Sequence, residues 1–376
     1  MKILVVNWQD IRHPQGGGAE VHLQEVFSRI ARMGHEVTLS CCRFPGAPRE
    51  EVIGGIRILR EGGRHFFNFR FLLSYLTRFR RESFDVVVDD MNKIPFFSPL
   101  FVRKPILGIT HHLFGKSIFL EANPLIAAYV YLMEALAVRL YRRTRVPFVV
   151  GSPSTYREMM HEGFPKSQIH LVPYGVDHDT HRMTGVPKSP FPLIGYIGRL
   201  KRYKSVDQLL RALPAVRANV PELKVQIVGE GGDRVRLESL SARLGLERCV
   251  GFTGFVTEER KLELLQQMWC KVTTSTKEGW GLTVIEANAC GIPVVASNVP
   301  GLRDAVKDNE TGLLYPYGDT HALAEQLTKL LTDEALRHRL ARNAVAWAET
   351  FDWNIAAEKT LALLEERAGK TIGAAG

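Results

Sequence analysis

Cysteine is scarce in this sequence, and no metal-ligand spacing is present. The chain of 376 residues holds five cysteines, Cys41, Cys42, Cys249, Cys270 and Cys290. Their number is odd and no two have the spacing of a zinc site, which disfavours a disulfide framework and a structural metal. We therefore expect five reduced thiols in a cytoplasmic protein.

Long apolar runs and a secretory leader are also missing. The N-terminus, MKILVVNWQD, becomes polar after a short apolar stretch, unlike a signal peptide. No run reaches the roughly 18 apolar residues that a membrane-spanning helix requires. The expected location is the cytoplasm, with peripheral attachment to the inner face of the plasma membrane left open.

A dinucleotide-binding fingerprint is absent as well. The loop GGGAE, residues 16–20, lies between the first expected strand and the first expected helix, where glycines let the backbone approach an anion. The pattern G-x-G-x-x-G is not met because Val21 takes its last position, and the next strand, VTLSCC, ends without an acid for a ribose. An NAD-binding role is disfavoured, and a plain tight turn stays open as the alternative.

The charge that is present is placed unevenly. Residues 1–185 hold 24 Lys and Arg against 17 Asp and Glu, a net charge of +7, whereas the remainder carries a net charge of +2. A basic N-terminal half favours an anionic partner there, such as membrane lipid, a phosphorylated acceptor or nucleic acid. Nucleic acid is disfavoured because no nucleic-acid-binding motif accompanies the charge.

Short apolar strands alternate with amphipathic helices along the whole chain. This pattern predicts parallel sheets covered by helices on both faces. The segment 179–192, DTHRMTGVPKSPFP, has no periodicity and reads as a linker. We predict two doubly wound, Rossmann-like α/β domains facing a central cleft, at residues 1–178 and 193–351. A final helix at about 352–368 is expected to pack back on the first domain.

The second domain opens with LIGYIGRLKRYKSVDQLL, which places basic side chains directly after a strand. Arg199 and Lys204 can form a diphosphate site at the start of the next helix, which Ser205 can cap. The alternative is a solvated basic turn, for which Arg202 is an equally good member.

The stretch KEGWGLTVIE, residues 277–286, holds two glutamates. Thr283 and Glu286 have the spacing of a capping box, which predicts that Thr283 caps a helix and that Glu286 lies in its first turn. Glu278 then lies on the preceding loop. If neither glutamate has a chemical role, Glu286 serves as a helix cap and Glu278 is an exposed charge on a loop.

These motifs together resemble the retaining glycosyltransferases of family four, which have the GT-B fold. Glu-Gly-Trp-Gly-Leu with a second Glu after seven intervening residues resembles the family's signature. The similarity spans about residues 3–355, with GGGAE, MGHEVTL and VPYGVD in the first domain. The second domain contributes, in order, GRLKRYKS, VGEGGDR, FTGFV, PVVAS, PGLRDAV and TGLLYP.

The resemblance implies roles for individual residues. Arg199 and Lys204 would hold the donor diphosphate, Glu286 the ribose hydroxyls, and Glu278 would lie near the donor sugar. Further donor-binding positions implied are Gly17, Gly18, Gly229, Phe255, Val256, Gly279, Trp280, Gly281, Leu282 and Thr283.

A histidine near the transferred sugar is also implied. His111 is the first choice over His112, and with Arg199, Lys204 and Glu278 it completes the implied catalytic set; a structural histidine is the alternative. The acceptor-binding positions implied are Glu20, Asp90, Asn92 and His112. Asp89 and Asp90 form an acidic pair, but the family usually works without a bound metal; a strand-end turn is the alternative.

The resemblance implies transfer of a hexose from a UDP- or GDP-sugar to an acceptor hydroxyl, with retained configuration and without a cofactor. The acceptor would be a lipid-linked or envelope glycan or a small-molecule glycoside. A glycoside hydrolase, a sugar-nucleotide epimerase and a non-catalytic nucleotide-sugar-binding protein are the alternatives.

The basic and aromatic stretch RHFFNFRFLLSYLTRFRRE, residues 64–82, has two interpretations. An apolar face at its start with flanking arginines is typical of a helix at an anionic membrane surface. A helix packed on the core, with a solvated arginine face, is the alternative.

Overall fold

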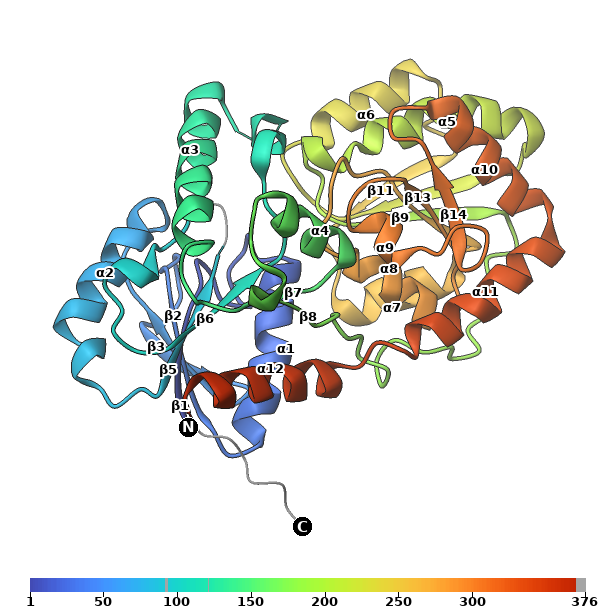
Figure 1. The fold of residues 1–376 in the computed structure, drawn as a ribbon. Coiled ribbons are helices and arrows are strands. Elements are labelled where there is room, and N and C mark those ends of the chain that lie inside the picture. Colours follow the sequence, from blue (N-terminus) through green and yellow to red (C-terminus); the bar gives the residue numbers. More distant parts are fainter. Residues whose placement is uncertain (92–93, 121, 370–376) are drawn as a thin grey trace, which may run out of the picture. The chain divides into compact units, whose positions relative to one another are not determined.

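The computed structural model describes residues 1–91, 94–120 and 122–369, and the chain divides into two compact units. The first unit is Met1–Gly175 together with the segment that begins at Asp352, and the second is Val176–Phe351. The sequence placed this boundary a few residues later, after residue 178. Each unit has its own parallel sheet with helices around it (Figure 1).

The first unit holds an eight-stranded sheet in the order β3-β4-β2-β1-β5-β6-β7-β8. Its strands are β1 Lys2–Val6, β2 Glu36–Cys41, β3 Glu50–Ile53, β4 Ile56–Arg60, β5 Val86–Asp90, β6 Ile106–Thr110, β7 Phe148–Val150 and β8 Ile169–Leu171. All neighbours pair in parallel except the hairpin of β3 and β4 at one edge. The strand order reverses between β1 and β5, so the crevice for a ligand lies at their carboxyl ends.

Helices of the first unit pack on both faces of this sheet. They are α1 Gly18–Arg32, α2 Phe67–Thr77, α3 Pro124–Tyr141, α4 Pro153–His161 and α12 Trp353–Arg367, with short 3-10 turns η1 Arg64–Phe66, η2 Phe79–Arg81, η3 Ser98–Leu100, η4 Gly115–Leu120 and η5 Lys166–Gln168. The final helix α12 lies against α1 (Figure 1), where Arg29 donates to Asn354 at 3.0 Å. Arg367 donates to the carbonyl of Ile106 at 3.1 Å, which ties the other end of α12 to β6.

The second unit holds a six-stranded, all-parallel sheet in the order β11-β10-β9-β12-β13-β14. Its strands are β9 Leu193–Ile197, β10 Lys224–Val228, β11 Val250–Gly254, β12 Cys270–Thr273, β13 Val294–Ser297 and β14 Gly312–Tyr315. Its helices are α5 Val206–Asn219, α6 Arg234–Arg243, α7 Glu258–Gln267, α8 Leu282–Ala289, α9 Leu302–Ala305, α10 Thr320–Thr332 and α11 Glu334–Ala348, with the turn η6 Arg202–Lys204. The strand order reverses between β9 and β12. The prediction of two doubly wound α/β domains is confirmed.

The segment that the sequence marks as a linker contains neither helix nor strand, but it belongs to the second unit. Ser189 bonds to α7 through its amide and accepts from Trp269 at 2.8 Å. Lys188 donates to the carbonyl of Gln266 at 3.0 Å. The lack of periodicity therefore identified irregular backbone correctly, but it gave no sign that this backbone packs on a domain.

Helix α3 bears on the expectation that the sequence holds no segment able to span a membrane. By length and composition alone it could cross a membrane, with a mean hydropathy of 1.3 over 18 residues, of which 33% are buried. Counting uninterrupted apolar residues missed it because Glu134 and Arg139 break the run. Its inner face contributes Ala137, Val138 and Tyr141 to the core of the first unit.

Gly175 is the point at which the first unit receives its C-terminal helix. A Cβ atom there would lie 2.2 Å from the backbone nitrogen of Trp353, and backbone cannot move aside as a flexible side chain can. We predict that Gly175→Ala lowers the free energy of unfolding by roughly 1–3 kcal/mol, as overpacking does. Chemical denaturation measures this, and Gly63→Ala, whose Cβ would meet nothing within 4 Å, is the control. Equal stability of the two variants would contradict the close approach.

Candidate functional site

The site in the second unit is built at the reversal of strand order, from the loops that follow β9, β10 and β12. The β9 and β10 loops approach each other backbone to backbone. A Cβ on Gly229 would lie 2.0 Å from the carbonyl oxygen of Gly198, and one on Gly231 would lie 2.1 Å from that of Leu200. The amide of Leu200 donates to the carbonyl of Glu230 at 2.8 Å. Glycine is therefore required at Gly229 so that the β10 loop can approach the β9 loop, which carries the basic residues. Gly229 thus shapes the backbone of the site.

Lys204 and Glu278, both predicted site residues, contact each other. The Lys204 ammonium donates to the Glu278 carboxylate, which also accepts from Ser275. Burial lowers the pKa of Lys204, but the Glu278 charge outweighs it and holds that pKa above its ordinary value. The loop carrying Glu278 is tied to the β9 loop by Thr274, which donates to the carbonyl of Lys204 at 2.8 Å. A charged lysine is thus fixed at the reversal point.

Arg199, Arg202 and Ser205 are the other predicted or candidate residues of this basic turn. Arg199 is half-buried and donates to the hydroxyl of Tyr203 at 3.3 Å. Arg202, the other candidate in this turn, has a side chain 70% exposed and lies 3.4 Å from Asp233. Ser205 occupies the N-cap position of α5 in a left-handed conformation, but its side chain makes no capping hydrogen bond. The prediction that Ser205 caps this helix through its side chain is therefore wrong.

The capping box predicted for α8 is wrong as well. The helix begins at Leu282 after Gly281, whose φ of +99° favours glycine, and no side chain caps it. Thr283 lies inside the first turn, where its hydroxyl accepts from Lys271 at 3.1 Å. Glu286 lies one turn further on. The sequence spacing fitted a box, but the glycine turn begins the helix two residues earlier than that box requires.

With no capping partner, Glu286 is held by basic groups. Its Oε2 lies 3.6 Å from the Lys261 ammonium and 3.9 Å from Nε2 of His181. Both are longer than the contacts of Lys261 with Glu258, so the Glu286 carboxylate retains room to accept further hydrogen bonds. Neither Lys261 nor His181 was predicted, because their contacts with Glu286 come from segments far from it in the sequence.

Gly301 fixes the backbone of the Glu278 loop, and Glu278 lies on that loop as expected. A Cβ on Gly301, whose φ is +82°, would lie 2.2 Å from the carbonyl oxygen of Glu278. The amide of Glu278 donates to the carbonyl of Pro300 at 3.2 Å. Trp280 is buried, with its ring edge-on to Phe351 at 5.0 Å between centroids. The side chain of Trp280 is therefore part of the core, and Trp280 contributes to the loop only through its backbone.

Phe255 and Val256 lie between β11 and α7. Phe255 is 84% exposed and Val256 is half-buried. An exposed aromatic ring on a loop beside the site is a surface on which a planar group can stack.

Lys271 is a buried lysine that the sequence analysis did not single out. It lies in β12 and donates to the hydroxyls of Thr273 at 2.8 Å and Thr283 at 3.1 Å. Burial lowers its pKa to about 7, although Glu286 opposes that shift. The bond to Thr283 links β12 to the first turn of α8. The sequence feature that could have identified Lys271 as buried is its position inside a short apolar strand, CKVT.

In the first unit, His111 and Asp90 come together. Nε2 of His111 lies 3.1 Å from Oδ2 of Asp90, and Nδ1 shares a hydrogen bond with the hydroxyl of Tyr174. Burial lowers the pKa of His111, but the Asp90 charge reverses this and leaves it above its ordinary value. His112 is half-buried, with its ring 4.4 Å from that of Phe114. Asn92 lies outside the described residues.

The acidic pair does not form a joint site. Asp90 faces His111, whereas Asp89 accepts from the hydroxyl of Tyr141, because neighbouring strand residues point to opposite faces of a sheet. Burial raises the pKa of Asp89 to about 6. Across the part of the chain that the structure describes, no group of three or more acidic, His or Cys side chains is arranged to hold a metal ion.

The glycine loop before α1 is closed by Glu20. Its buried carboxylate accepts from the amide of Gly17 at 2.7 Å, and burial raises its pKa. Gly18 has open space around the position of a Cβ. His22, which sequence reasoning missed, lies fully buried on α1 with its ring stacked on Tyr174 at 4.3 Å. Its place on the apolar face of α1 was the only available signal.

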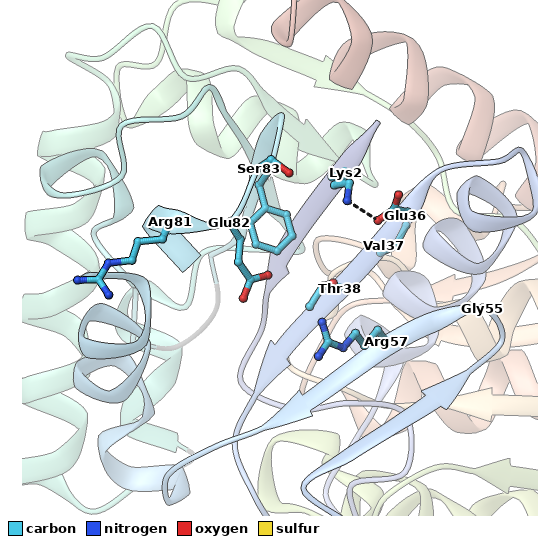
Figure 2. Close-up of a pocket in the computed structure, with 10 residues that line it drawn as sticks. Lys2, Glu36, Val37, Thr38, Gly55, Arg57, Arg81, Glu82 and Ser83 are labelled. Carbon is cyan, nitrogen blue, oxygen red and sulfur yellow. Dashed lines mark ion pairs between the residues drawn. The ribbon is translucent and has the colours of Figure 1, made fainter. Parts of the chain in front are cut away.

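A pocket of about 540 Å³ lies elsewhere in the first unit (Figure 2). Lys2, Glu36 and Arg57 line it at or near the amino ends of β1, β2 and β4, and Lys2 forms an ion pair with Glu36 at 3.1 Å. Asp90 and His111 lie at the carboxyl ends of their strands. Ligands of doubly wound sheets bind at the carboxyl ends, so this pocket is not part of the site.

Two family models match the sequence in succession. The model described as Glycosyltransferase Family 4 matches residues 16–180, and the model described as Glycosyl transferases group 1 matches residues 177–347. The D-inositol 3-phosphate glycosyltransferase of Corynebacterium jeikeium is 33% identical over 217 residues, which are 53% of this chain and 52% of the relative. The chain spans about half the length of the curated relatives it matches.

Solved structures resemble the whole chain. Sucrose-phosphate synthase from Thermosynechococcus elongatus has a TM-score of 0.84 at 21% identity, over 97% of this chain and 98% of that chain. The Anabaena protein HepE, in complex with UDP-glucose, has a TM-score of 0.76 at 19% identity, over 97% of this chain and 100% of that chain. At these identities the likeness shows the fold.

The buried Lys271 makes stability depend on pH. Its pKa is lower in the folded chain, so the unfolded chain binds more protons between about pH 7 and its ordinary value, and stability rises with pH across that window. We predict that Lys271→Met raises the free energy of unfolding at pH 6 by on the order of 2 kcal/mol, net of two lost hydrogen bonds. Chemical denaturation at pH 6 and pH 9.5 should show a smaller gain at the higher pH. The exposed Lys329→Met is the control, and an equal gain for Lys271→Met at both pH values would contradict the assignment.

Proposed function

Because the chain belongs to the group 1 glycosyltransferases, we propose that it transfers a hexose from a nucleoside-diphosphate sugar to an acceptor hydroxyl with retained configuration. The donor is a UDP- or GDP-sugar. The observation that carries the proposal is the fixed Lys204 charge beside the uncapped start of α8, both at the reversal of strand order in the second unit. The UDP-glucose complex of HepE supports a donor of this class, and the relatives named D-inositol 3-phosphate glycosyltransferase support glycosyl transfer.

The diphosphate is the group that these features suit. When the sugar leaves, negative charge develops on the departing phosphate, and fixed positive groups stabilise it. Lys204 supplies an ammonium and Arg199 a guanidinium, while the first amides of α8 supply the positive end of a helix. Lys204 is already bonded to Glu278 before a donor binds. In this proposal the Lys204 ammonium bridges the Glu278 carboxylate and the phosphate, and Glu278 accepts from the sugar hydroxyls.

The nucleoside is assigned to Glu286 and Phe255. A carboxylate can accept two hydrogen bonds from the two hydroxyls of a ribose, and the long contacts of Glu286 with Lys261 and His181 leave its oxygens accessible to them. The exposed ring of Phe255 offers a stacking surface for the base. No feature of this loop selects uracil over guanine.

The acceptor is assigned to the first unit. Asp90 and Tyr174 fix both nitrogens of His111, so the ring is oriented before a substrate arrives. His111 would contact the transferred sugar, and Glu20, Asp90 and His112 would face the acceptor. The departing phosphate takes the acceptor proton in the mechanism implied by the family, so no protein nucleophile is required. We propose that the reaction needs no metal and takes place in the cytoplasm, where the five buried, unpaired cysteines stay reduced.

The hydrolase alternative fits the geometry poorly. It requires one protonated carboxyl group as a general acid. Glu278 lies against the Lys204 ammonium and Glu286 against the Lys261 ammonium, so each carboxyl group faces a cation and not a group that would accept a proton from it. An epimerase or a non-catalytic binding protein on this fold would also bind a nucleotide sugar, and only transfer to an acceptor distinguishes the proposed enzyme from these two.

The ribose assignment is tested with paired ligands. We predict that wild-type protein binds UDP or GDP more tightly than the matching 2′-deoxynucleotide, and that Glu286→Gln loses this preference. A hydrogen bond to a charged group is worth about 1.5–3 kcal/mol, roughly a 10- to 150-fold change in Kd. Isothermal titration calorimetry measures the four affinities. Glu258→Gln, which removes the other carboxylate on Lys261, is the matched control and should keep the preference. A Glu286→Gln variant that still discriminates would refute the assignment.

The diphosphate assignment is tested by comparing each nucleoside diphosphate with its nucleoside. We predict that Lys204→Met shrinks this ratio of affinities at least tenfold, because a half-buried, charged partner of the phosphate is lost. The double variant Lys204→Met/Glu278→Gln should show the same loss, which excludes repulsion by an unpaired Glu278 as its cause. Arg202→Met, a change in the same turn on an exposed side chain, should leave the ratio unchanged. If Arg202→Met shrinks the ratio and Lys204→Met does not, the phosphate would be reassigned to Arg202.

A further inference from the structure

Helix α3 exposes an apolar row. Leu125 is 85% exposed, Tyr129 44%, Leu132 54% and Leu136 40%. Their spacing of four, three and four positions places all of them on one side of a helix. Ile126 on α3, with Phe119 and Leu120 on the neighbouring η4, adds further exposed apolar side chains. Large exposed apolar patches mark interaction sites.

The acidic charge of this helix is turned inward. Glu134 is buried and accepts from the amides of Phe114 and Gly115, both at 2.6 Å. These bonds hold the start of η4 against α3. Arg139 is the other charged residue between Pro124 and Tyr141, so the outward face carries no charge before Arg139.

A basic rim follows the apolar row. Arg139, Arg143 and Arg145 are exposed, and within the described residues none of them forms an ion pair with an acid. The sequence contains no acidic residue between Glu134 and Glu158. Apolar side chains that insert below the headgroups, next to arginines that contact phosphate, are the features of an interfacial helix.

We propose that the η4–α3 surface docks on an anionic lipid surface. We define this surface by Phe119, Leu120, Leu125, Tyr129, Leu132 and Leu136, with Arg139, Arg143 and Arg145 as its basic rim. The helix lies in the interface and does not span the membrane, because Glu134 and the buried Ala127, Val130 and Ala137 hold its inner side on the protein. Figure 1 shows α3 standing out from the sheet of the first unit, with η4 beside it.

The stretch for which the sequence analysis considered membrane contact, residues 64–82, is the weaker candidate. Helix α2 also exposes Phe69 and Leu73, but its opposite face contributes Phe67 and Phe71 to the core. Two of the five arginines in this stretch are paired with acids, since Arg70 lies 3.4 Å from Glu61 and Arg78 lies 2.9 Å from Glu82, whereas the η4–α3 rim holds no such pair among the described residues. Paired arginines are less available to lipid phosphates than those of the η4–α3 surface.

The η4–α3 surface also indicates what kind of acceptor the enzyme uses, a step that rests on the proposed function. β6 ends at Thr110, His111 follows, and η4 begins at Gly115. Docking would therefore hold His111 near the lipid headgroups. An acceptor sugar carried on a lipid would reach this histidine without leaving the membrane, at the inner face of the plasma membrane.

Vesicle binding by the whole chain tests the proposal. Co-sedimentation is measured with phosphatidylcholine vesicles that contain either no or about one third phosphatidylglycerol. We expect binding only to the anionic vesicles, at least a tenfold loss of it for Leu125→Gln/Leu132→Gln, and a roughly fivefold loss for each rim arginine changed to Gln. The matched control, Phe69→Gln/Leu73→Gln on α2, should bind as the wild type does.

Further readouts separate the outcomes. The nucleotide affinity of Leu125→Gln/Leu132→Gln, measured without vesicles, should equal that of the wild type. A loss of this affinity would indicate damage to the fold. A wild type that binds vesicles but no nucleotide would refute the proposed function and leave the docking surface standing. Vesicle binding that survives the α3 changes, or that is lost only in the α2 variant, would overturn the docking surface. A dimer seen by light scattering that the α3 variant abolishes, without any vesicle binding, would overturn it in favour of a second copy of the chain.

Discussion

The reversal of strand order in each sheet is the constraint on which the two sites depend. Where neighbouring strands connect in opposite directions, their following loops separate and leave a crevice at the carboxyl edge. Between β9 and β12 this crevice receives the basic turn and the Glu278 loop, and the β5 and β6 ends beside the first reversal carry Asp90 and His111. The glycines at Gly229 and Gly301 then allow backbones to approach more closely than any side chain would permit.

The charges in the second unit are arranged in pairs before any ligand binds. Lys204 is held by Glu278, and Glu286 is held loosely by Lys261 and His181. Such pairing offsets part of the desolvation cost of partly burying these charged groups. A bound diphosphate would add a second anion to Lys204. The hydrogen bonds of Lys271 in the described part of the chain go to the hydroxyls of Thr273 and Thr283 and not to a carboxylate, and burial lowers its pKa.

The first unit combines a rigid site with an apolar surface. Asp90, Tyr174 and His22 surround His111 closely, whereas α3, which follows shortly after in the chain, exposes leucines and tyrosines. Glu134 connects the two features, because it holds the backbone at Phe114 and Gly115 and leaves the outer face of α3 without charge before Arg139. A sequence pattern of apolar residues does not distinguish the buried side of such a helix from its exposed side.

Much of the architecture could be read from the sequence. The alternation of strands and helices determined two doubly wound units, and the motifs determined which loops follow β9 and β12, because both depend on local patterns of apolar residues and glycine. The pairing of Lys204 with Glu278 and the bond from Lys271 to Thr283 in place of a capping box depend on residues from different elements, as does the choice of α1 as the helix against which α12 lies. Only the tertiary structure decided these, because a side chain's partner is set by packing between elements, which no local spacing records.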